Sequence, residues 1–277
     1  MEYIHKTIIA NGKSVTKINI TPVDKTVIYE VLRIVNGIPL FIEKHLSRLN
    51  NSASLLNKTL PFSVSEFKNL IDTLITENKV FIGNIKISVF FEENATPVDS
   101  VIGFISHAYP SEQDYEFGVK TVSSIKQRLN PGAKVQNTKL RNELNDFIRS
   151  EKAYEAILVH PDGYITEGSR SNLFFIMGNK IFTAPDNLVL SGITRENVIE
   201  LCNLNNYNLD FTPVSYTDLN KMDAAFITGT SPKVLPVKQI DELEFRLPHP
   251  IITDLMEMYD KLIADYLKMH QKTKKTS

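Results

Sequence analysis

The sequence predicts a mixed α/β protein of the α+β type, built from two domains. Its 277 residues are enough for two domains of ordinary size. Stretches with the alternation of β-strands and stretches with the period of amphipathic helices occur in both halves of the chain. Between the halves, around "PSEQDYEFG", both patterns are lost. We therefore expect a smaller N-terminal α/β domain over 1–112, a connection over 113–122 and a larger C-terminal domain over 123–277.

The first half begins with a predicted hairpin. "KTVIYEVLRIVNGIPLFI" alternates, and Asn36-Gly37 between two β-rich runs is typical of a tight turn of the primed type. "EKHLSRLNNSASLLN" and "SEFKNLIDTLITENK" each carry an apolar stripe with helical spacing. The stripes are Leu46, Leu49, Ala53 and Leu56 in the first, and Phe67, Leu70, Ile71, Leu74 and Ile75 in the second. "NIKISVFF" and "SVIGFISHAY" are predicted strands.

The second half begins with a predicted helix, "NTKLRNELNDFIRSEK", followed by a meander of short strands. The strands are "YEAILVH", "YITEG", "NLFFIM" and "KIFTA", with turns at "PDG" and "GN". "SGITRENVIELCNL" predicts a loop that leads into a helix, with Thr194 as the N-cap and an incomplete capping box. A strand at "DAAFITGT" and an amphipathic helix at "HPIITDLMEMYDKLIADYLKMH" complete the order.

Charge and cysteine content limit the classes of function. Lys and Arg number 31 against 32 Asp and Glu, so no broad basic surface is available for nucleic acid or an anionic membrane. A single cysteine, Cys202, excludes a disulfide framework within the chain. No apolar run approaches the roughly 20 residues that span a bilayer. We expect a soluble cytoplasmic protein that binds neither membrane nor nucleic acid, and any bound anion must occupy a local site.

Several large enzyme classes are excluded by missing motifs. The sequence contains no G-x-G-x-x-G, no Walker A loop, no G-x-S-x-G and no H-E-x-x-H. Its six histidines are scattered, without a spacing that would place two on one helix face as metal ligands. We expect no metal site.

Two segments have features of an anion site. In "SGITRENV" the backbone amides of Ile193 and Thr194 lie at the start of the predicted helix, where unpaired donors and the helix dipole favour an anion. "ITGTSPK" ends a strand with a glycine and hydroxyl side chains, a composition suited to a loop of inward-turned amides. For either string taken alone, an ordinary capped helix or an ordinary turn is the favoured interpretation.

Arg48 and Glu167 each admit two interpretations. Arg48 lies at the edge of the buried stripe of its helix, either as an arginine with its head in solvent or as a guanidinium that holds a phosphate in a fork; spacing alone favours the first. Glu167 lies between predicted strands, where a carboxylate is rarely buried without a partner. It is either half of a structural salt bridge or an acid that faces a ligand.

Taken in order, five segments resemble the fold-type IV pyridoxal-phosphate enzymes. This group contains branched-chain aminotransferases, D-amino-acid aminotransferases and aminodeoxychorismate lyases. The segments lie between Val27 and Val237 and cover about 100 residues. They are "VIYEVLRIVNGIPLFIEKHLSRLNNSASLL", "NTKLRNELNDF", "YEAILVHPDGYITEGSRSNLFFIMGNKIFTAP", "LVLSGITRENVI" and "DAAFITGTSPKVLPV". The resemblance implies a two-domain fold like that of D-amino-acid aminotransferase, pyridoxal 5′-phosphate as cofactor, and a homodimer.

The resemblance also implies roles for individual residues. Lys139 matches the Schiff-base lysine, which shuttles a proton between substrate carbon and cofactor. Glu167 matches the acid that pairs with the cofactor's pyridine nitrogen and keeps it protonated. The remaining cofactor-binding matches are Arg48, Ser171, Asn172, Leu190, Gly192, Ile193, Thr194 and Thr230. For the phosphate, the resemblance selects Arg48, Thr230, the hydroxyl of Thr194 and the amides of Ile193 and Thr194, which are groups that the anion argument also considers.

The sequence departs from each subgroup in a different way. Leu144 stands where branched-chain aminotransferases typically have a tyrosine, so Lys139-x-x-Asn142-x-Leu144 looks more like the D-enzymes and lyases. The arginine and histidine pair of the D-enzymes has no counterpart in "IKISVFFEENATP". Gly229-Thr230-Ser231 is closer to the transaminases than to the lyases. The candidates for binding the substrate are Tyr29, Arg33, Lys86, Arg170 and Ser231.

We therefore expect an aminotransferase that moves an amino group between a small amino acid and a 2-oxo acid. The alternative is 4-amino-4-deoxychorismate lyase, which uses the same lysine and cofactor to release pyruvate and 4-aminobenzoate. A cofactor-binding protein without turnover is a third hypothesis, against which the set of Lys139, Glu167 and Arg48 argues.

Overall fold

In the computed structural model, which describes residues 3–18, 25–92, 97–128 and 130–275, the chain divides into two units. The first contains Met1–Ala108, Ala133–Gln136 and Ile263–Ser277, and the second contains Tyr109–Gly132 and Asn137–Leu262. The predicted connection over 113–122 contains most of helix α3 (Glu112–Phe117) and the start of strand β7 (Val119–Ile125), both in the second unit. The helix begins with a capping box at Ser111, a signal that the sequence reading of "PSEQDYEFG" missed.

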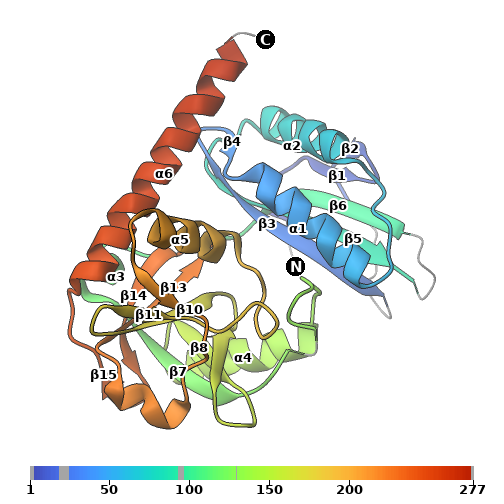
Figure 1. The fold of residues 1–277 in the computed structure, drawn as a ribbon. Helices are drawn as coiled ribbons and strands as arrows, with labels where there is room; N and C mark the ends of the chain where they lie inside the picture. The colour runs from blue at the N-terminus through green and yellow to red at the C-terminus, as the bar shows by residue number, and fades with distance from the viewer. Residues whose placement is uncertain (1–2, 19–24, 93–96, 129, 276–277) are drawn as a thin grey trace. The chain divides into compact units, whose positions relative to one another are not determined.

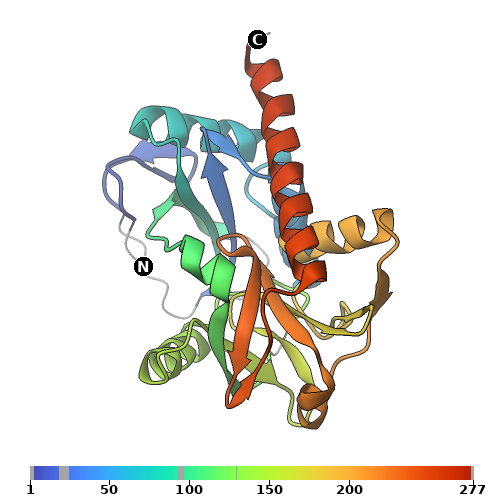
Figure 2. The same ribbon diagram turned by 90° about the vertical axis from the view of Figure 1, so that its left-hand side faces the viewer.

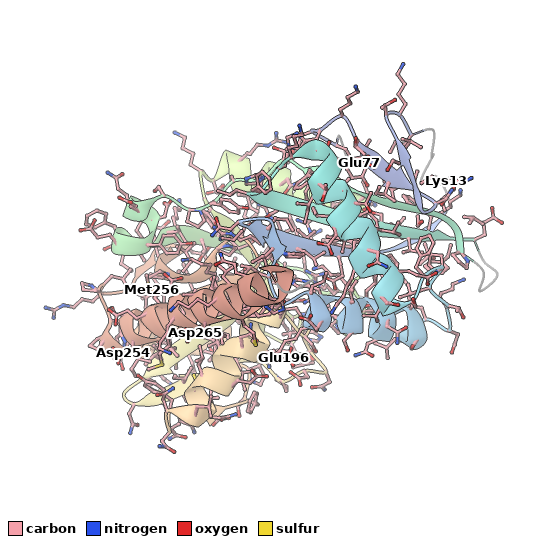
Figure 3. The ribbon with its side chains drawn as sticks, turned by 90° about the horizontal axis from the view of Figure 1, so that it is seen from above. Lys13, Glu77, Glu196, Asp254, Met256 and Asp265 are labelled. Atoms are coloured by element: carbon pink, nitrogen blue, oxygen red, sulfur yellow. The ribbon has the colours of Figure 1, made fainter. Side chains whose placement is uncertain are left out.

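The first unit is a twisted antiparallel sheet with two helices on one face (Figure 1). The order of its strands is β2-β1-β6-β5-β3-β4. Their bounds are Ile8–Ala10 (β1), Lys13–Val15 (β2), Thr26–Val35 (β3), Ile38–Pro39 (β4), Gly83–Phe91 (β5) and Pro97–Ile105 (β6). The helices are α1 (Ile42–Leu55) and α2 (Val64–Asn78). Ser14 on β2 donates to the carboxylate of Glu77 on α2 at 2.9 Å. Figure 3 labels Glu77 on α2 and Lys13, the neighbour of Ser14 on β2.

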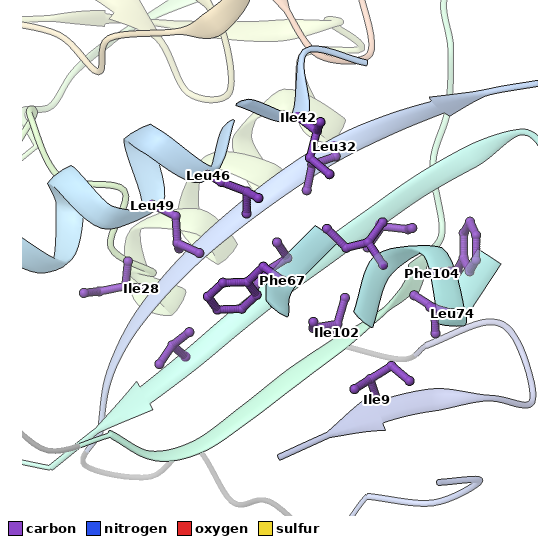
Figure 4. Close-up of a cluster of buried hydrophobic side chains, with 14 of the residues drawn as sticks. Ile9, Ile28, Leu32, Ile42, Leu46, Leu49, Phe67, Leu74, Ile102 and Phe104 are labelled. Carbon is purple, nitrogen blue, oxygen red and sulfur yellow. The ribbon is translucent and has the colours of Figure 1, made fainter. Parts of the chain in front are cut away.

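The predicted hairpin is present between β3 and β4. Val35 pairs with Ile38, and Asn36 (φ 52°) and Gly37 (φ 72°) both have the positive φ that a type I′ turn requires. The sheet, α1 and α2 then bury one apolar cluster, in which Leu32, Leu46 and Phe67 are at most 1% exposed (Figure 4). Each such side chain contributes about 1.5–3 kcal/mol relative to exposure. The even-numbered residues of β3 face this cluster, with one charged residue, Glu30, among them.

The second unit is built on a strand ring in the order β10-β13-β14-β7-β8-β9, which closes because β9 also pairs with β10. Strands β11 and β12 extend it beyond β10, and β15 pairs with β14. The remaining bounds are Glu155–Val159 (β8), Ile165–Gly168 (β9), Asn172–Met177 (β10), Lys180–Phe182 (β11), Asn208–Asp210 (β12), Ala224–Gly229 (β13), Lys233–Ile240 (β14) and Leu243–Glu244 (β15).

Helices cover the outside of this ring. α4 (Thr138–Ser150) packs against β8, α5 (Ile193–Leu204) against β13, and α3 lies beside β14, as Figure 2 shows. A 3₁₀ helix runs over Tyr216–Lys221, and α6 runs over Pro250–Lys275, divided between the two units at Leu262. No helix among the described residues is both long and apolar enough to cross a bilayer.

Candidate active site

Glu167 lies at the end of β9 and is 2% exposed. Its Oε1 atom is 2.7 Å from Nε of Arg128, and its Oε2 atom accepts a hydrogen bond from the backbone amide of Leu190 at 3.2 Å. A carboxylate is stable at such depth only when charge and hydrogen-bond partners compensate the loss of water. The structural salt bridge expected for a buried acid is therefore present, and Arg128 is its cation.

Asn172 clamps the same residue, Leu190, from its other side. The Asn172 side-chain amide donates to the Leu190 carbonyl at 2.8 Å, and Asn172 pairs with Glu167 across β10 and β9. A Cβ atom at Gly192 would lie 2.0 Å from Oδ1 of Asn172, a distance that real atoms do not adopt. Glycine at 192 is thus required for the approach of Asn172. Glu167, Asn172, Leu190 and Gly192 are brought together as the sequence motifs predict.

Helix α5 begins at Gly192, so the prediction that Thr194 is the N-cap is wrong. The Gly192 carbonyl accepts the first helical hydrogen bond, from the amide of Glu196 at 2.8 Å. Thr194 is the second residue inside the helix, and its hydroxyl receives a hydrogen bond from Tyr259 at 3.3 Å. A side chain at the N-cap was assumed from residue type, whereas contact with Asn172 excludes one at this position.

The start of α5, like that of α1, has no side-chain cap and so differs from the starts of α2, α3 and α4. Those three helices have an N-cap side chain that accepts from a backbone amide, on Ser63, Ser111 and Asn137. Gly192 has no side chain to do so. Backbone donors at an uncapped helix start, together with the helix dipole, favour an anion.

A buried hydroxyl marks the strand next to this helix. Thr228 pairs with Asn172 across β13 and β10, is 1% exposed, and its Oγ1 atom has no hydrogen-bond partner among the residues that the structure describes. Thr230 and Ser231 follow in the turn between β13 and β14. A buried hydroxyl without a partner is costly, and a polar ligand would satisfy it. The buried acid, the uncapped helix and this hydroxyl together form a donor and acceptor set that fits a ring nitrogen and a phosphate.

Ser171 and Arg170 belong to the turn that joins β9 to β10. Ser171 is buried, and its hydroxyl donates to the carboxylate of Glu155 at 3.1 Å. The backbone amide of Arg170 donates to the same carboxylate at 3.3 Å, while the Arg170 side chain is exposed. Glu155 therefore holds the turn through these hydrogen bonds, and the side chain of Arg170 is left exposed.

Lys139 is the second residue of α4 and is exposed. Asn137 caps the helix by accepting from the amide of Leu140 at 3.0 Å, and the opposite face packs Leu144 against β8. Among the described contacts, no hydrogen bond or ion pair joins Lys139 to Glu167. Glu143 lies one turn further along the helix. The pKa of its carboxyl is lowered by Lys126 and, more weakly, by Lys139.

Arg48 lies in the first unit and is buried, so the interpretation favoured by its spacing, a head group in solvent, is wrong. Its Nε and Nη2 atoms each donate to one carboxylate oxygen of Glu30 at 2.7 Å. His45, one turn earlier on α1, lies 2.9 Å from the same carboxylate through Nδ1. The side chain of Arg48 is 9% exposed and that of Glu30 is 0% exposed. The acid on the core face of β3 thus determines where the guanidinium lies.

The charges of this cluster support one another. Burial alone would raise the pKa of Glu30, but the charge and hydrogen bonds of Arg48 and the contact with His45 hold it well below its usual value. The pKa of His45 is lowered, chiefly by burial and further by Arg48, against the opposing effect of Glu30. An ionised Glu30 beside a neutral His45 follows from these directions.

Three further substrate candidates, Tyr29, Arg33 and Lys86, lie on the other face of the first unit's sheet. Lys86 is 3% exposed, donates to the side chain of Gln136 at 2.6 Å and lies 4.8 Å from the ring centre of Tyr29. Lys134 lies 4.9 Å from the same ring. Arg33 is two positions along β3 from Val31, which pairs with Lys86. Cations thus gather around one tyrosine in this unit.

Sequence reasoning missed four residues that hold these groups. Glu30 stands among apolar residues on the core face of β3, and a charge at such a position is itself a signal of a buried partner. His45 is three residues before Arg48 on the same helix face. Arg128 and Glu155 carry no comparable signal, because their partners are distant in sequence. No group of His, Cys, Asp or Glu in the described residues could hold a metal ion.

The model of the amino-transferase class IV family matches residues 27–240. The chain belongs to the class IV aminotransferase family. Members of this family are pyridoxal-phosphate enzymes, and the fold and function predicted from the sequence motifs are confirmed at this level. The chain is 31% identical to D-alanine aminotransferase of Bacillus licheniformis over 223 residues, which is 77% of this chain and 78% of that protein. It is 25% identical to a branched-chain-amino-acid aminotransferase of Pseudomonas aeruginosa over 83% of this chain and 80% of that one.

Solved structures show the same fold. A branched-chain amino acid aminotransferase from T.th., solved with pyridoxamine 5′-phosphate, matches with a TM-score of 0.85 at 23% identity, over 96% of both chains. A putative 4-amino-4-deoxychorismate lyase of Legionella pneumophila matches with a TM-score of 0.79 at 20% identity, over 88% of this chain and 96% of that one. Both structures show the fold of this class IV aminotransferase.

Proposed function

We propose that this class IV aminotransferase binds pyridoxal 5′-phosphate and moves an amino group between a small amino acid and a 2-oxo acid. The observation that carries the proposal is the buried carboxylate of Glu167, held by Arg128 and Leu190 beside the uncapped start of α5. An acid for a ring nitrogen and a row of amides for a phosphate are what this cofactor requires. The family motifs supply the remaining groups.

The phosphate is assigned to the second unit's amides of Ile193 and Thr194 and hydroxyls of Thr194 and Thr230. Amides at the start of a helix, together with hydroxyl groups, bind a dianion without needing a charged side chain at every oxygen. Arg48 is added to this set on the family motif alone, and Ser171 is assigned to shaping the turn. Asn172 donates to the carbonyl of Leu190, and the amide of Leu190 donates to Glu167. Leu190 and Asn172 are therefore assigned to keeping the subsite for the cofactor ring at a fixed position relative to Glu167.

Each catalytic group has one task. Bound pyridoxal phosphate supplies an electron-withdrawing ring that stabilises negative charge on the substrate's α-carbon. The carboxylate of Glu167 holds the proton on the ring nitrogen. The amine of Lys139 would hold the cofactor, and would move the proton from the substrate's α-carbon to the cofactor. For the substrate carboxylate we keep Tyr29, Arg33 and Lys86 of the first unit, and Arg170 and Ser231 of the second, as candidates.

The test is the absorption spectrum of the purified protein with pyridoxal phosphate, followed while D- and L-alanine and L-valine are added. We expect a yellow band that one amino acid bleaches, and that Lys139→Ala alters while Lys134→Ala does not. A band that no amino acid bleaches, together with pyruvate release from aminodeoxychorismate without an acceptor, would assign the lyase activity instead. A protein that gives no band would contradict the cofactor assignment.

The family resemblance also implies a homodimer with a smaller and a larger domain, and the single cysteine favours a cytoplasmic location. We propose all three on these grounds. Light scattering after gel filtration tests the first, because a monomer at the concentration of the activity assay would overturn it.

A further inference from the structure

Glu155 is a buried acid that the proposed mechanism does not use. It lies at the start of β8, is 3% exposed, and has no cationic partner among the residues that the structure describes. Burying a carboxylate without a counter-ion is expensive, so its position requires other compensation. That compensation comes from four neutral donors, of which three lie in one turn.

The donors surround both oxygens of the carboxylate. Oε1 accepts from the hydroxyl of Ser169 and from the amide of Ala156 at 3.0 Å. Oε2 accepts from the hydroxyl of Ser171 at 3.1 Å and from the amide of Arg170 at 3.3 Å. Three of the four donors therefore belong to residues 169–171, the whole link between β9 and β10.

The turn packs closely against the acid at Gly168. A Cβ atom at Gly168 would lie 2.1 Å from the Ser171 hydroxyl oxygen and 3.2 Å from Cγ of Glu155. The amide of Gly168 donates to the carbonyl of Ser171 at 2.8 Å, which closes the turn on itself. On the far side, Arg128 donates through Nη2 to the carbonyl of Ser169 at 3.1 Å. Glu155 and Arg128 thus hold Ser169 from two directions.

Both ends of this turn carry a residue of the proposed cofactor site. Glu167 precedes it and Asn172 follows it, and the two clamp the amide and the carbonyl of Leu190. Asn172 is also in contact with the position of Gly192, where α5 begins. A shift of the turn would therefore change the position of the acid for the ring nitrogen relative to the amides for the phosphate.

We propose that Glu155 is a positioning residue that keeps the ring-nitrogen subsite at Glu167 in register with the phosphate subsite at the start of α5. The proposal rests on the proposed binding of pyridoxal phosphate. A ligand with two recognised ends gains affinity from both only when the two subsites are correctly spaced. Loss of Glu155 should then weaken binding of the whole cofactor more than binding of its separate parts.

The experiment measures the dissociation constants of three ligands: pyridoxal phosphate, pyridoxal and inorganic phosphate. We expect Glu155→Gln to weaken the binding of pyridoxal phosphate by about tenfold or more, which is the effect of losing one hydrogen bond to a charged group. Pyridoxal and phosphate should each change by less than about twofold. Glu155→Asp retains the charge but shortens the reach, and should lose affinity for the whole cofactor in the same way. Glu151→Gln, an exposed acid in the same unit, is the matched control and should bind all three like the wild type.

Each other outcome has a definite meaning. Equal loss of all three ligands by Glu155→Gln would show a loosened fold and overturn the positioning role. Wild-type affinity of Glu155→Gln for pyridoxal phosphate would overturn it as well, and full affinity in Glu155→Asp would show that charge suffices and position does not matter. A wild-type protein that binds phosphate but not pyridoxal phosphate would overturn the proposed function, and the inference with it.

Discussion

The first unit and the second unit each bury one arginine–glutamate pair, and they use it in opposite directions. In the first, Arg48 is the residue that the family motif assigns to the phosphate, and Glu30 holds it in a fork. In the second, Glu167 is the residue assigned to the ring nitrogen, and Arg128 holds it. The same two residue types are thus used in one unit to orient a cation and in the other to orient an anion. The comparison separates the member of a pair that meets a ligand from the member that positions it.

The pairs should differ most in stability when the acid is removed. Glu30→Ala leaves the buried Arg48 without its counter-ion and should cost about 3–5 kcal/mol. Glu167→Ala should cost less, about 1–3 kcal/mol, because the side chain of Arg128 is 18% exposed against 9% for Arg48 and regains water more easily. Urea unfolding of both variants measures this, and equal losses would remove the distinction between the pairs.

The pairs should differ next in ligand affinity when the arginine is removed. Arg48→Met should weaken pyridoxal phosphate by roughly 10- to 100-fold, since it deletes charge-assisted hydrogen bonds to the phosphate. Arg128→Met should leave the affinity for inorganic phosphate within about twofold, because Arg128 contacts Glu167 and Ser169 and is not assigned to the phosphate. Fluorescence titration with both ligands checks this. A loss of phosphate binding in Arg128→Met would show that the second pair also serves the anion.

The first pair should make stability depend on pH. The pKa of His45 is lowered in the folded state. The stability associated with a neutral His45 is therefore complete above the pKa of the unfolded state, near 6.5, and is lost as the pH falls below that pKa. Glu30 also has a lowered pKa, and its contribution is lost only as the pH falls below about 4.5. Each proton taken up on unfolding reduces stability by at most about 1.4 kcal/mol per pH unit.

The measurement is urea unfolding of the wild type and of His45→Gln between pH 8 and pH 4. Glutamine still donates to Glu30 but does not titrate, so the loss between about pH 6.5 and 4.5 should disappear and the loss below it should remain. An unchanged pH profile would show that His45 is not the titrating group.

The smallest effect concerns the starts of the helices. α2 in the first unit begins with a complete capping box between Ser63 and Glu66, whereas α5 in the second begins without a side-chain cap. Ser63→Ala should cost about 1 kcal/mol in urea unfolding. Ser54→Ala, an exposed serine inside α1, should stay within about 0.5 kcal/mol of the wild type.

The elements of the two units could be predicted wherever the apolar period was long. The β3–β4 hairpin and helices α1, α2, α4, α5 and α6 follow from alternation, helical stripes and turn residues. The short strands β1, β2, β12 and β15 and helix α3 were missed, because segments of so few residues show no clear period. Strand β7 was missed because Lys, Thr and Ser make up more than half of its residues and leave no clear apolar alternation. β14 was missed because Pro236 interrupts its apolar run, although the strand belongs to the ring.

The site shows a different limit. Lys139, Glu167 and the start of α5 could be selected from family motifs, since these are local strings. The groups that hold these residues could not be selected in this way. Arg128 contacts Glu167 only after β7 and β9 have joined the ring, and Glu155 on β8 contacts Ser171 only after the link between β9 and β10 has folded against it. The position of Arg48 was misjudged for the same reason: spacing on α1 defines its face of the helix, but Glu30 on β3 defines its burial.

The ring of the second unit closes through the pair of Glu167 and Asn172, with only residues 169–171 between the strands. One residue more or less in this link would turn one of the two side chains to the opposite face of the sheet. We therefore expect a change of length in this link to disrupt the site more than a substitution does. The turns at Gly163 and Gly178, where an added Cβ would meet nothing within 4 Å, are the places where related sequences can lengthen without losing the site.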